Sequence, residues 1–354
     1  MTPLAELLIR RIAATGPISV AEFMADCLMH PAHGYYSTRD PLGAAGDFTT
    51  APEISQMFGE LIGLALAQTW ADQGAPAPVT LAELGPGRGT LMADALRAAA
   101  KFPGFADAAQ VHLVEASPAL RARQRATLPG HAVTWHDHAG TLPEAPLLLI
   151  ANEFFDALPI RQFQRDPSGW RERQVGLTDG ALAFGLSAPA PLAELAPRRA
   201  DTTPGDIVET CAPARPVMGA IANRIAAHGG AALIVDYGDW RSRGDTLQAV
   251  RGHAPEDPLA HPGAADLTAH VDFEALAQAA PGLAHSRLTP QGVFLERLGI
   301  TARAQALAGA LSGDALTAHI AAHRRLTHPA EMGSLFKVLA LYPPGLSPPP
   351  GLEP

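Results

Sequence analysis

The 354-residue sequence predicts an α/β fold built around a mostly parallel sheet. Short runs that are apolar at every position recur along the chain, and most are separated by stretches with helical apolar spacing. A strand that is apolar throughout is buried on both faces, as happens when helices cover both sides of a parallel sheet. The expected strands are 79–84, 111–115, 132–135, 146–151, 231–237, 284–288 and 335–341.

Helices are expected before this sheet. Segments 3–14 and 20–30 have helical spacing, and a Gly- and Asp-rich loop follows them. A longer amphipathic helix is then predicted from about residue 53 to residue 72, because its apolar residues recur on one side. Two further helical stretches, "FLERLGITARAQALAGAL" and "GDALTAHIAAHRRLTH", lie between the last two strands.

The connection after the fourth strand, 156–230, is unusually long. Its alternating stretches "IRQFQR", "RERQVGL" and "ALAFGL" predict a small antiparallel element, and a helix is expected near 214–227. Such an insertion can form one wall of a substrate cleft. The prolines in "YPPGLSPPPGLEP" predict an irregular tail.

Composition excludes several classes of protein. Hydrophobic residues make up 47% and charged residues 17%, which suits a large core and excludes general disorder. The formal charge of −9 and the lack of Lys/Arg runs argue against a nucleic-acid partner. No apolar run reaches membrane-spanning length and the start lacks a signal-peptide cleavage pattern, so we expect a cytoplasmic protein without a membrane span. Cys27 and Cys211 lie far apart in sequence, which predicts buried thiols instead of a disulfide framework.

The stretch "LAELGPGRGTL" contains the pattern E-x-G-x-G-x-G, with Gly85, Gly87 and Gly89 between a strand and a helix. A dinucleotide fingerprint would place a glycine or small residue where Thr90 stands. Glu83 at the strand end would repel a pyrophosphate but would suit an ammonium or a sulfonium. The loop is therefore expected to approach a ligand group that is not a phosphate.

Two acidic residues end the next two strands. Glu115 can accept both hydroxyls of a ribose, and Asp137 can accept from an adenine amine while Trp135 or His136 borders the ring. A nucleoside held by carboxylates beside a glycine loop describes S-adenosylmethionine, with S-adenosylhomocysteine as product. The pattern disfavours a nicotinamide cofactor.

The fourth strand ends in "LLLIANEFFDALPIRQF", where Asn152, Glu153 and Asp156 leave the carboxyl edge of the expected sheet. Ligands of open α/β folds bind at this edge. Asn152 or Asp156 alone could equally cap a turn. We interpret the group as catalytic, with Asn152 also contacting the cofactor.

Several longer stretches carry a family resemblance. The sequence resembles the MidA family, relatives of the mitochondrial complex I assembly methyltransferase, in "HGYYSTRDPLGAAGDFTTAPEISQMFGELIG", "LAELGPGRGTL", "ANEFFDALPIRQF", "IVDYGDW", "DPLAHPGAADLTAHVDF", "TPQGVFLERLGI" and "EMGSLFKVLAL". The resemblance implies the class I S-adenosylmethionine-dependent methyltransferase fold, which is Rossmann-like with a mostly parallel seven-stranded sheet. It also implies symmetric dimethylation of an arginine on a core subunit of respiratory complex I, and the mitochondrial matrix as location if the chain is eukaryotic.

The predicted elements divide the chain into functional segments. We expect a helical segment with a cofactor-covering loop at 1–75, the cofactor-binding core at 76–155 and a substrate-side insertion at 156–230. The rest of the core would occupy 231–342, and the tail 343–354.

Further site residues are predicted from the remaining motifs. "GDFTTAPE" is expected to fold over the cofactor with Asp47, Phe48, Thr50 and Glu53, although a plain turn that opens a helix would explain Thr50 and Glu53 equally well. The residues expected to line the substrate side are Asp236, Tyr237 and His270. Asp266, His270 and Asp272 do not have tight ligand spacing, so no metal is expected.

Guanidinium chemistry gives the residues after the fourth strand a role. A carboxylate binds a guanidinium through a bidentate fork, and Glu153 is the first candidate for this partner, Asp156 the second. Two alternatives stay open: a small-molecule methyltransferase that uses the same nucleoside pocket, and an S-adenosylmethionine-binding assembly factor without catalysis.

Overall fold

The computed structural model describes residues 1–38 and 50–354, which form two compact units. Unit 1 contains the described part of Met1–Phe48 with Asp156–Ala214 and Arg241–Asp272. Unit 2 contains the described part of Thr49–Phe155 with Arg215–Trp240 and Phe273–Pro354. Among the described residues, no helix is both long and apolar enough to cross a membrane.

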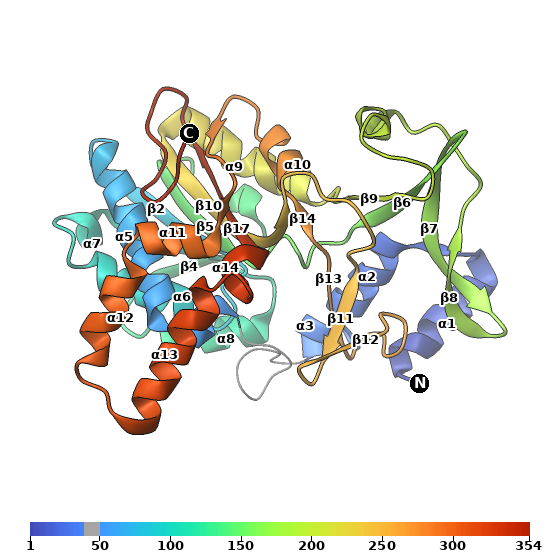
Figure 1. Cartoon of the computed structure of the whole chain (residues 1–354), viewed down its shortest axis with the longest axis horizontal. Coiled ribbons are helices and arrows are strands. Elements are labelled where there is room, and N and C mark those ends of the chain that lie inside the picture. The colour runs from blue at the N-terminus through green and yellow to red at the C-terminus, as the bar shows by residue number, and fades with distance from the viewer. Residues whose placement is uncertain (39–49) are drawn as a thin grey trace. The chain divides into compact units, whose positions relative to one another are not determined.

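Unit 2 is organised by a sheet whose path runs β15-β17-β10-β5-β2-β3-β4 (Figure 1). Its strands are β2 (Val79–Leu84), β3 (Ala109–Val114), β4 (Val133–His136), β5 (Leu147–Asn152), β10 (Gly230–Asp239), β15 (Ala284–His285) and β17 (Phe336–Tyr342), and β16 (Thr289–Pro290) also pairs with β17. The pairings from β4 to β10 are parallel, whereas β17 is antiparallel to β10. The predicted mostly parallel α/β fold is confirmed.

The strand order fixes where a ligand can bind. From β2 the chain runs outward to β3 and β4, and it then returns to the other side of β2 with β5 and β10. The carboxyl ends of β2 and β5 therefore flank the switch point at which ligands of open α/β sheets bind. Every residue of β2 and β5 is buried, as the apolar runs predicted.

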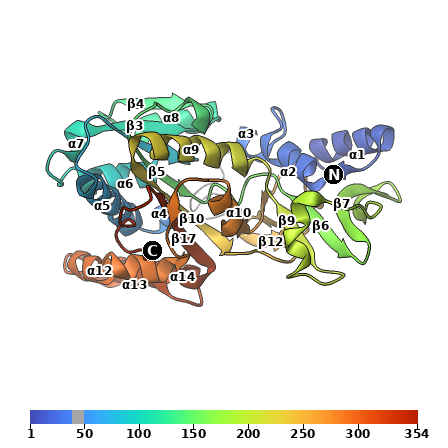
Figure 2. The same ribbon diagram turned by 90° about the horizontal axis from the view of Figure 1, so that it is seen from above.

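Helices cover both faces of this sheet, and Figure 2 shows α9 on the opposite side from α12 and α13. The helices of unit 2 are α4 (Ala51–Ile54), α5 (Gln56–Asp72), α6 (Thr90–Ala99), α7 (Phe105–Ala108), α8 (Pro118–Thr127), α9 (Ala214–His228, whose first residue belongs to unit 1), α10 (Phe273–Gln278), α11 (Gln291–Arg297), α12 (Ile300–Ala308), α13 (Gly313–Thr327) and α14 (Met332–Leu335), with a 3-10 turn at Ala139–Thr141. Helices α5 and α6 approach closely, because a Cβ at Gly63 would stand 2.5 Å from the carbonyl oxygen of Ala95.

The prediction of one continuous helix over 53–72 is wrong, because the segment forms two helices. The chain forms α4 and then α5, with Ser55 extended between them at φ −161°. The Ser55 hydroxyl accepts from the amide of Met57 and so caps α5, which is a preferred role of serine. The apolar periodicity does not reveal this break, because it continues on both sides.

Unit 1 combines the N-terminal helices with the inserted strands. Its elements are α1 (Pro3–Thr15), β1 (Ile18–Ser19), α2 (Val20–Met29), α3 (Tyr35–Thr38), β6 (Arg161–Asp166), β7 (Gly169–Thr178), β8 (Ala181–Leu186), β9 (Ile207–Thr210), β11 (Gln248–Arg251), β12 (Ala254–Glu256), β13 (Asp266–Thr268) and β14 (Val271–Asp272), with 3-10 turns at Ala193–Leu195 and Pro197–Arg199. The predicted antiparallel insertion is present as the path β1-β7-β6-β9, with β8 beside β7. Ile18 of β1 pairs with Val175 of β7, so the chain start and the insertion share one core.

The last twelve residues contain no helix or strand, as predicted, yet they pack on unit 2. Leu352 belongs to the main core, and the carboxylate of Glu353 lies 2.6 Å from Arg297. The tail is therefore irregular in secondary structure but part of the unit.

Candidate active site

The glycine loop follows β2 and leads into α6. Gly85, Gly87 and Gly89 have φ of 60°, 52° and 85°, in the left-handed region that favours glycine. A Cβ at Gly85 would also stand 3.0 Å from the Phe154 ring, so this position needs glycine for space as well as for φ. Gly89 precedes the first residue of α6, which places the loop at a helix N-terminus.

Glu83, at the end of β2, has an unusual environment. Its side chain is buried and accepts a hydrogen bond from the amide of Met92. Burial raises the pKa of this carboxyl to about 8, and the Met92 bond opposes the rise only in part. Its Oε2 has no hydrogen-bond partner among the described residues.

Glu115 lies just beyond β3, where its carboxylate is held by two donors. Oε1 accepts from the amide of Ser117 at 2.8 Å, and Oε2 accepts from Nε2 of Gln124 at 3.3 Å. Burial raises the pKa of Glu115, which these hydrogen bonds partly offset. The carboxylate is thus fixed in orientation beside the glycine loop, because Gln124 also donates to the Gly87 carbonyl.

Asp137 lies just beyond β4. Its side chain is 81% exposed and pairs with Arg121 at 2.6 Å. Arg121 also donates to the carbonyl of Glu115 at 2.7 Å, so this guanidinium joins the ends of β3 and β4. Adenine recognition by Asp137 remains a prediction.

The turn after β5 is conformationally strained. Glu153 has φ 50°, a region that non-glycine residues rarely adopt and that is often associated with functional sites. Its Oε1 accepts from the amide of Ala51 at 3.2 Å and from Nδ2 of Asn152 at 3.1 Å. Oδ1 of Asn152 is buried without a hydrogen-bond partner among the described residues.

Asp236 supports this turn from the neighbouring strand β10. Its fully buried carboxylate accepts from the amide of Phe155 at 3.1 Å and from that of Tyr237 at 2.9 Å. The amide of Glu153 donates to the carbonyl of Val235 at 2.9 Å. These contacts give Asp236 a role in positioning the turn, and its predicted contact with substrate stays a prediction.

Helix α4 is tied to both sides of the switch point. Oε1 of Glu53 accepts from the Thr90 hydroxyl at 2.6 Å, at the start of α6, while Ala51 donates to Glu153. Thr50 precedes α4 and its carbonyl accepts from the amide of Glu53 at 2.9 Å. The segment 50–54 therefore contacts both the glycine-loop helix and the turn after β5.

Four predicted residues are not among the described residues of unit 2. Asp47 and Phe48 lie outside the described residues. Asp156 and His270 belong to unit 1, where the carbonyl of Asp156 accepts from Ala269 at 3.0 Å and the amide of His270 donates to the Thr246 hydroxyl at 2.8 Å. Within 1–38 and 50–354 no cluster of three or more His, Cys, Asp or Glu residues could hold a metal ion.

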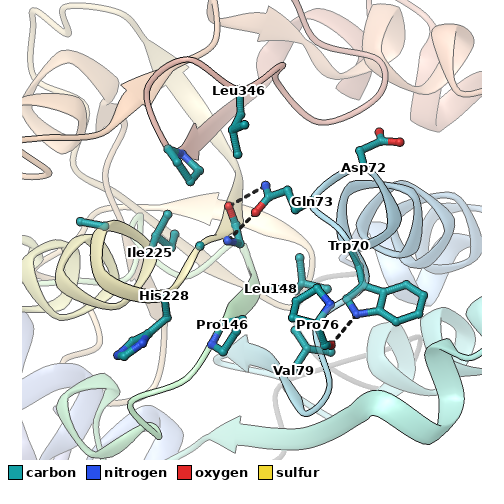
Figure 3. Close-up of a pocket in the computed structure, with 14 residues that line it drawn as sticks. Trp70, Asp72, Gln73, Pro76, Val79, Pro146, Leu148, Ile225, His228 and Leu346 are labelled. Atoms are coloured by element: carbon teal, nitrogen blue, oxygen red, sulfur yellow. Dashed lines mark hydrogen bonds between the residues drawn. The ribbon is translucent and has the colours of Figure 1, made fainter.

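A cavity of about 510 Å³ is shown in Figure 3. It lies at the amino edge of the sheet, because Val79 begins β2, Pro146 precedes β5 and Gly230 begins β10. Trp70, Val79, Leu148 and Ile225 give it apolar walls. Gln73 spans one side by bonding both the amide and the carbonyl of Gly230. Among the residues that line the cavity, all of them described, none has a buried polar side-chain atom without a hydrogen-bond partner, so we do not assign the cavity to the reaction.

The carboxyl edge does present such atoms. An unpartnered buried acceptor costs free energy unless a ligand donates to it. Glu83 Oε2 and Asn152 Oδ1 thus favour a ligand with a cation or N–H donors, and Glu115 is placed for hydroxyl donors. S-adenosylmethionine carries an ammonium, ribose hydroxyls and an adenine amine, so the residues at this edge fit it.

Comparison with known proteins agrees with this donor set. Residues 61–291 match the family described as "Putative S-adenosyl-L-methionine-dependent methyltransferase". The chain belongs to this family. A Burkholderia thailandensis structure with bound S-adenosyl-homocysteine superposes with a TM-score of 0.84 at 32% identity, covering 98% of this chain and 93% of that one. The chain is an S-adenosylmethionine-dependent methyltransferase, as the sequence predicted.

Curated relatives of this methyltransferase bear a more specific name. The mouse protein arginine methyltransferase NDUFAF7, mitochondrial, is 39% identical, covering 97% of this chain and 85% of its own length. The Drosophila melanogaster homologue is 38% identical, covering 96% of this chain and 85% of its own length.

Gln124 belongs to the site but is not predicted from the sequence motifs. Gln124 is fully buried in α8, between the buried Leu120 of the same helix and the buried Leu128 just past its end. A polar side chain at i+4 from one leucine and i−4 from the next interrupts an apolar stripe, which is the signal that could have identified it.

Proposed function

We propose that this methyltransferase modifies the guanidinium group of an arginine in a protein substrate. The observation that carries the proposal is the Asn152–Glu153 pair, an amide and a carboxylate held in a strained turn at the carboxyl end of β5. The names of relatives that are 38–39% identical along nearly the whole chain support the same substrate class.

S-adenosylmethionine supplies the reaction with a methyl group on a sulfonium. Glu83, Glu115 and Asn152 would hold it, as argued from their buried acceptors. Glu153 would bind the substrate guanidinium through charge-assisted hydrogen bonds and leave one nitrogen toward the methyl donor. The proton lost from that nitrogen can pass to a carboxylate of the site.

The internal contacts of Glu153 hold its carboxylate in place. Oε1 accepts from the amide of Ala51 and from Nδ2 of Asn152. Those two donors fix the carboxylate, so little entropy remains to be lost when a guanidinium binds. Asp156, three residues further along the same motif, is the second candidate for the partner.

We extend the proposal to the product and the target that the family resemblance implies. Symmetric dimethylarginine would be formed on a core subunit of respiratory complex I or a similar protein. The inserted strands of unit 1 would provide contacts to this protein. The reaction would take place in the cytoplasm of a bacterial cell.

The test is to incubate the enzyme with a cell lysate and radiolabelled S-adenosylmethionine, hydrolyse the labelled protein and separate the methylated arginines. We expect label in monomethylarginine and symmetric dimethylarginine. Gly87→Val should abolish labelling, because a β-branched side chain resists the φ of 52° at that loop position. Glu144→Gln, at the amino side of β5 with a largely exposed side chain, serves as the control and should label normally.

Two outcomes would contradict the proposal. Label confined to small molecules would favour a small-molecule methyltransferase. Tight binding of S-adenosylhomocysteine without any transfer to protein would favour a binding role in assembly.

A further inference from the structure

We propose that Gln124 is a positioning residue for the cofactor: its amide locks the glycine loop, the ribose-binding carboxylate and the indole of β4 into one arrangement. Gln124 contributes no atom to the reaction. It acts through Gly87, Glu115 and Trp135, which come from three different segments of unit 2.

Three hydrogen bonds carry the inference. Nε2 of Gln124 donates to the carbonyl of Gly87 at 2.8 Å and to Oε2 of Glu115 at 3.3 Å. Oε1 accepts from the indole Nε1 of Trp135 at 2.8 Å. The side chain is fully buried, so water does not replace any of these partners easily.

The chemistry of the partners fixes which way the amide points. An indole N–H can only donate, so Oε1 must face Trp135, and Nε2 must then face the two acceptors. Glutamine is suited to this position because it offers an acceptor and two donor hydrogens on one rigid plane. A glutamate would bring a second carboxylate against Glu115, and a methionine would leave the Gly87 carbonyl and the indole without this partner.

Each bond constrains a part of the cofactor site. The bond to Gly87 holds a loop residue whose φ is 52°, and so sets the direction of the neighbouring loop amides. The bond to Glu115 acts together with the Ser117 amide to aim the carboxylate. The bond to Trp135 fixes an indole whose ring also lies under Arg125, at 4.6 Å from the ring centroid.

The test compares Gln124→Met with a matched control at the opposite edge of the sheet. Gln73 also ties a helix end to a strand with both amide atoms, through the amide and carbonyl of Gly230. We expect Gln124→Met to raise the Kd for S-adenosylhomocysteine, measured by calorimetry, by about 10- to 100-fold, the effect of losing one to two such hydrogen bonds. Gln73→Met should lower the melting temperature by about as much as Gln124→Met does. It should leave the Kd for S-adenosylhomocysteine unchanged.

A second comparison separates positioning from general loosening. If Gln124 acts partly through Glu115, the two substitutions are not additive, so Gln124→Met should raise the Kd less in a Glu115→Ala background than in the parent. The KM for S-adenosylmethionine should rise in Gln124→Met while the KM for the methyl acceptor stays constant.

A Kd within twofold of the parent for folded Gln124→Met would overturn the inference, as would an equal effect of Gln73→Met. If Gln124→Met does not fold, Trp135→Phe decides the question. This change keeps an aromatic ring but removes the donor to Gln124, and it should raise the Kd about 3- to 10-fold. An unchanged Kd in Trp135→Phe would then contradict the proposal.

Discussion

Replacing Glu83 with glutamine should make the folded protein more stable and should weaken its binding of the cofactor. The buried carboxyl of the cofactor-free protein has a pKa of about 8, raised by burial. At pH 7 it is about one tenth ionised, so presenting a carboxylate to a cationic ligand costs about 1.4 kcal/mol. Because the ligand selects the ionised form, binding of S-adenosylhomocysteine at pH 7 should release close to one proton.

The assay is calorimetry of S-adenosylhomocysteine binding in buffers with different ionisation enthalpies. For the parent, the apparent enthalpy should vary with the buffer, and the Kd should rise about tenfold for each pH unit lowered below 8. Glu83→Gln keeps the acceptor for the Met92 amide but cannot ionise, so it should bind weakly, with little pH dependence. Equal heats in all buffers, together with parental affinity in Glu83→Gln, would show that Glu83 neither ionises on binding nor holds the ligand by its charge.

The folding stability of Glu83→Gln should rise, whereas its affinity for the cofactor should fall. The folded pKa of Glu83 lies above the ordinary carboxyl value of 4.5, so stability is greatest below that value and is lost as the pH rises toward 8. Glu83→Gln removes this loss. Urea denaturation of the cofactor-free proteins at pH 8 should show the variant to be more stable, by a difference on the order of 1–3 kcal/mol. A less stable variant would mean that the ionised carboxylate has a favourable partner in the fold.

The remaining predictions concern the ribose contact, the helix packing and a histidine pair. Glu115→Ala should weaken S-adenosylhomocysteine binding by about 1.5–3 kcal/mol in calorimetry, and unchanged affinity would place the ribose elsewhere. Gly63→Ala should destabilise the fold by about 1–3 kcal/mol in urea, because its Cβ would stand 2.5 Å from the carbonyl oxygen of Ala95, whereas Gly219→Ala in α9 meets no atom within 4 Å and should cost nothing. Burial and the neighbouring His136 lower the pKa of His112 to about 4, so stability should fall as the pH drops from 6.5 to 4, and His112→Phe should flatten that slope.

The parallel strands could be predicted from the sequence because they are buried on both faces. A short apolar run without alternation, bounded by turn residues, is typical of such a strand. Strand β2 matches its predicted bounds, while β5 differs by one residue at each end. The shared core of unit 1 could not be predicted in this way. It depends on Ile18 pairing with Val175, across more than 150 residues, and a two-residue strand leaves no periodicity to detect.

The site was predictable where residue type alone carries the chemistry. Glycines in E-x-G-x-G-x-G indicate positive φ, and Gly85, Gly87 and Gly89 adopt it. The strain at Glu153 leaves no such signal in the sequence, because a glutamate rarely adopts a φ of 50° and so does not indicate one. Oε1 of Glu153 accepts from its neighbour Asn152 and also from Ala51, which is distant in the sequence. Only the folded chain therefore reveals that this carboxylate also holds α4.

Arginine binding by Glu153 is tested by the single-turnover rate of methyl transfer to an arginine substrate by Glu153→Gln with saturating S-adenosylmethionine. The amide keeps the shape of the side chain but loses the charge that would hold a guanidinium. We predict a rate lower by about a hundredfold or more, the scale of a lost preorganised electrostatic contact, with the Kd for S-adenosylhomocysteine unchanged. A parental rate, or a loss of cofactor affinity in step with the rate, would contradict the assignment of Glu153 to the substrate arginine.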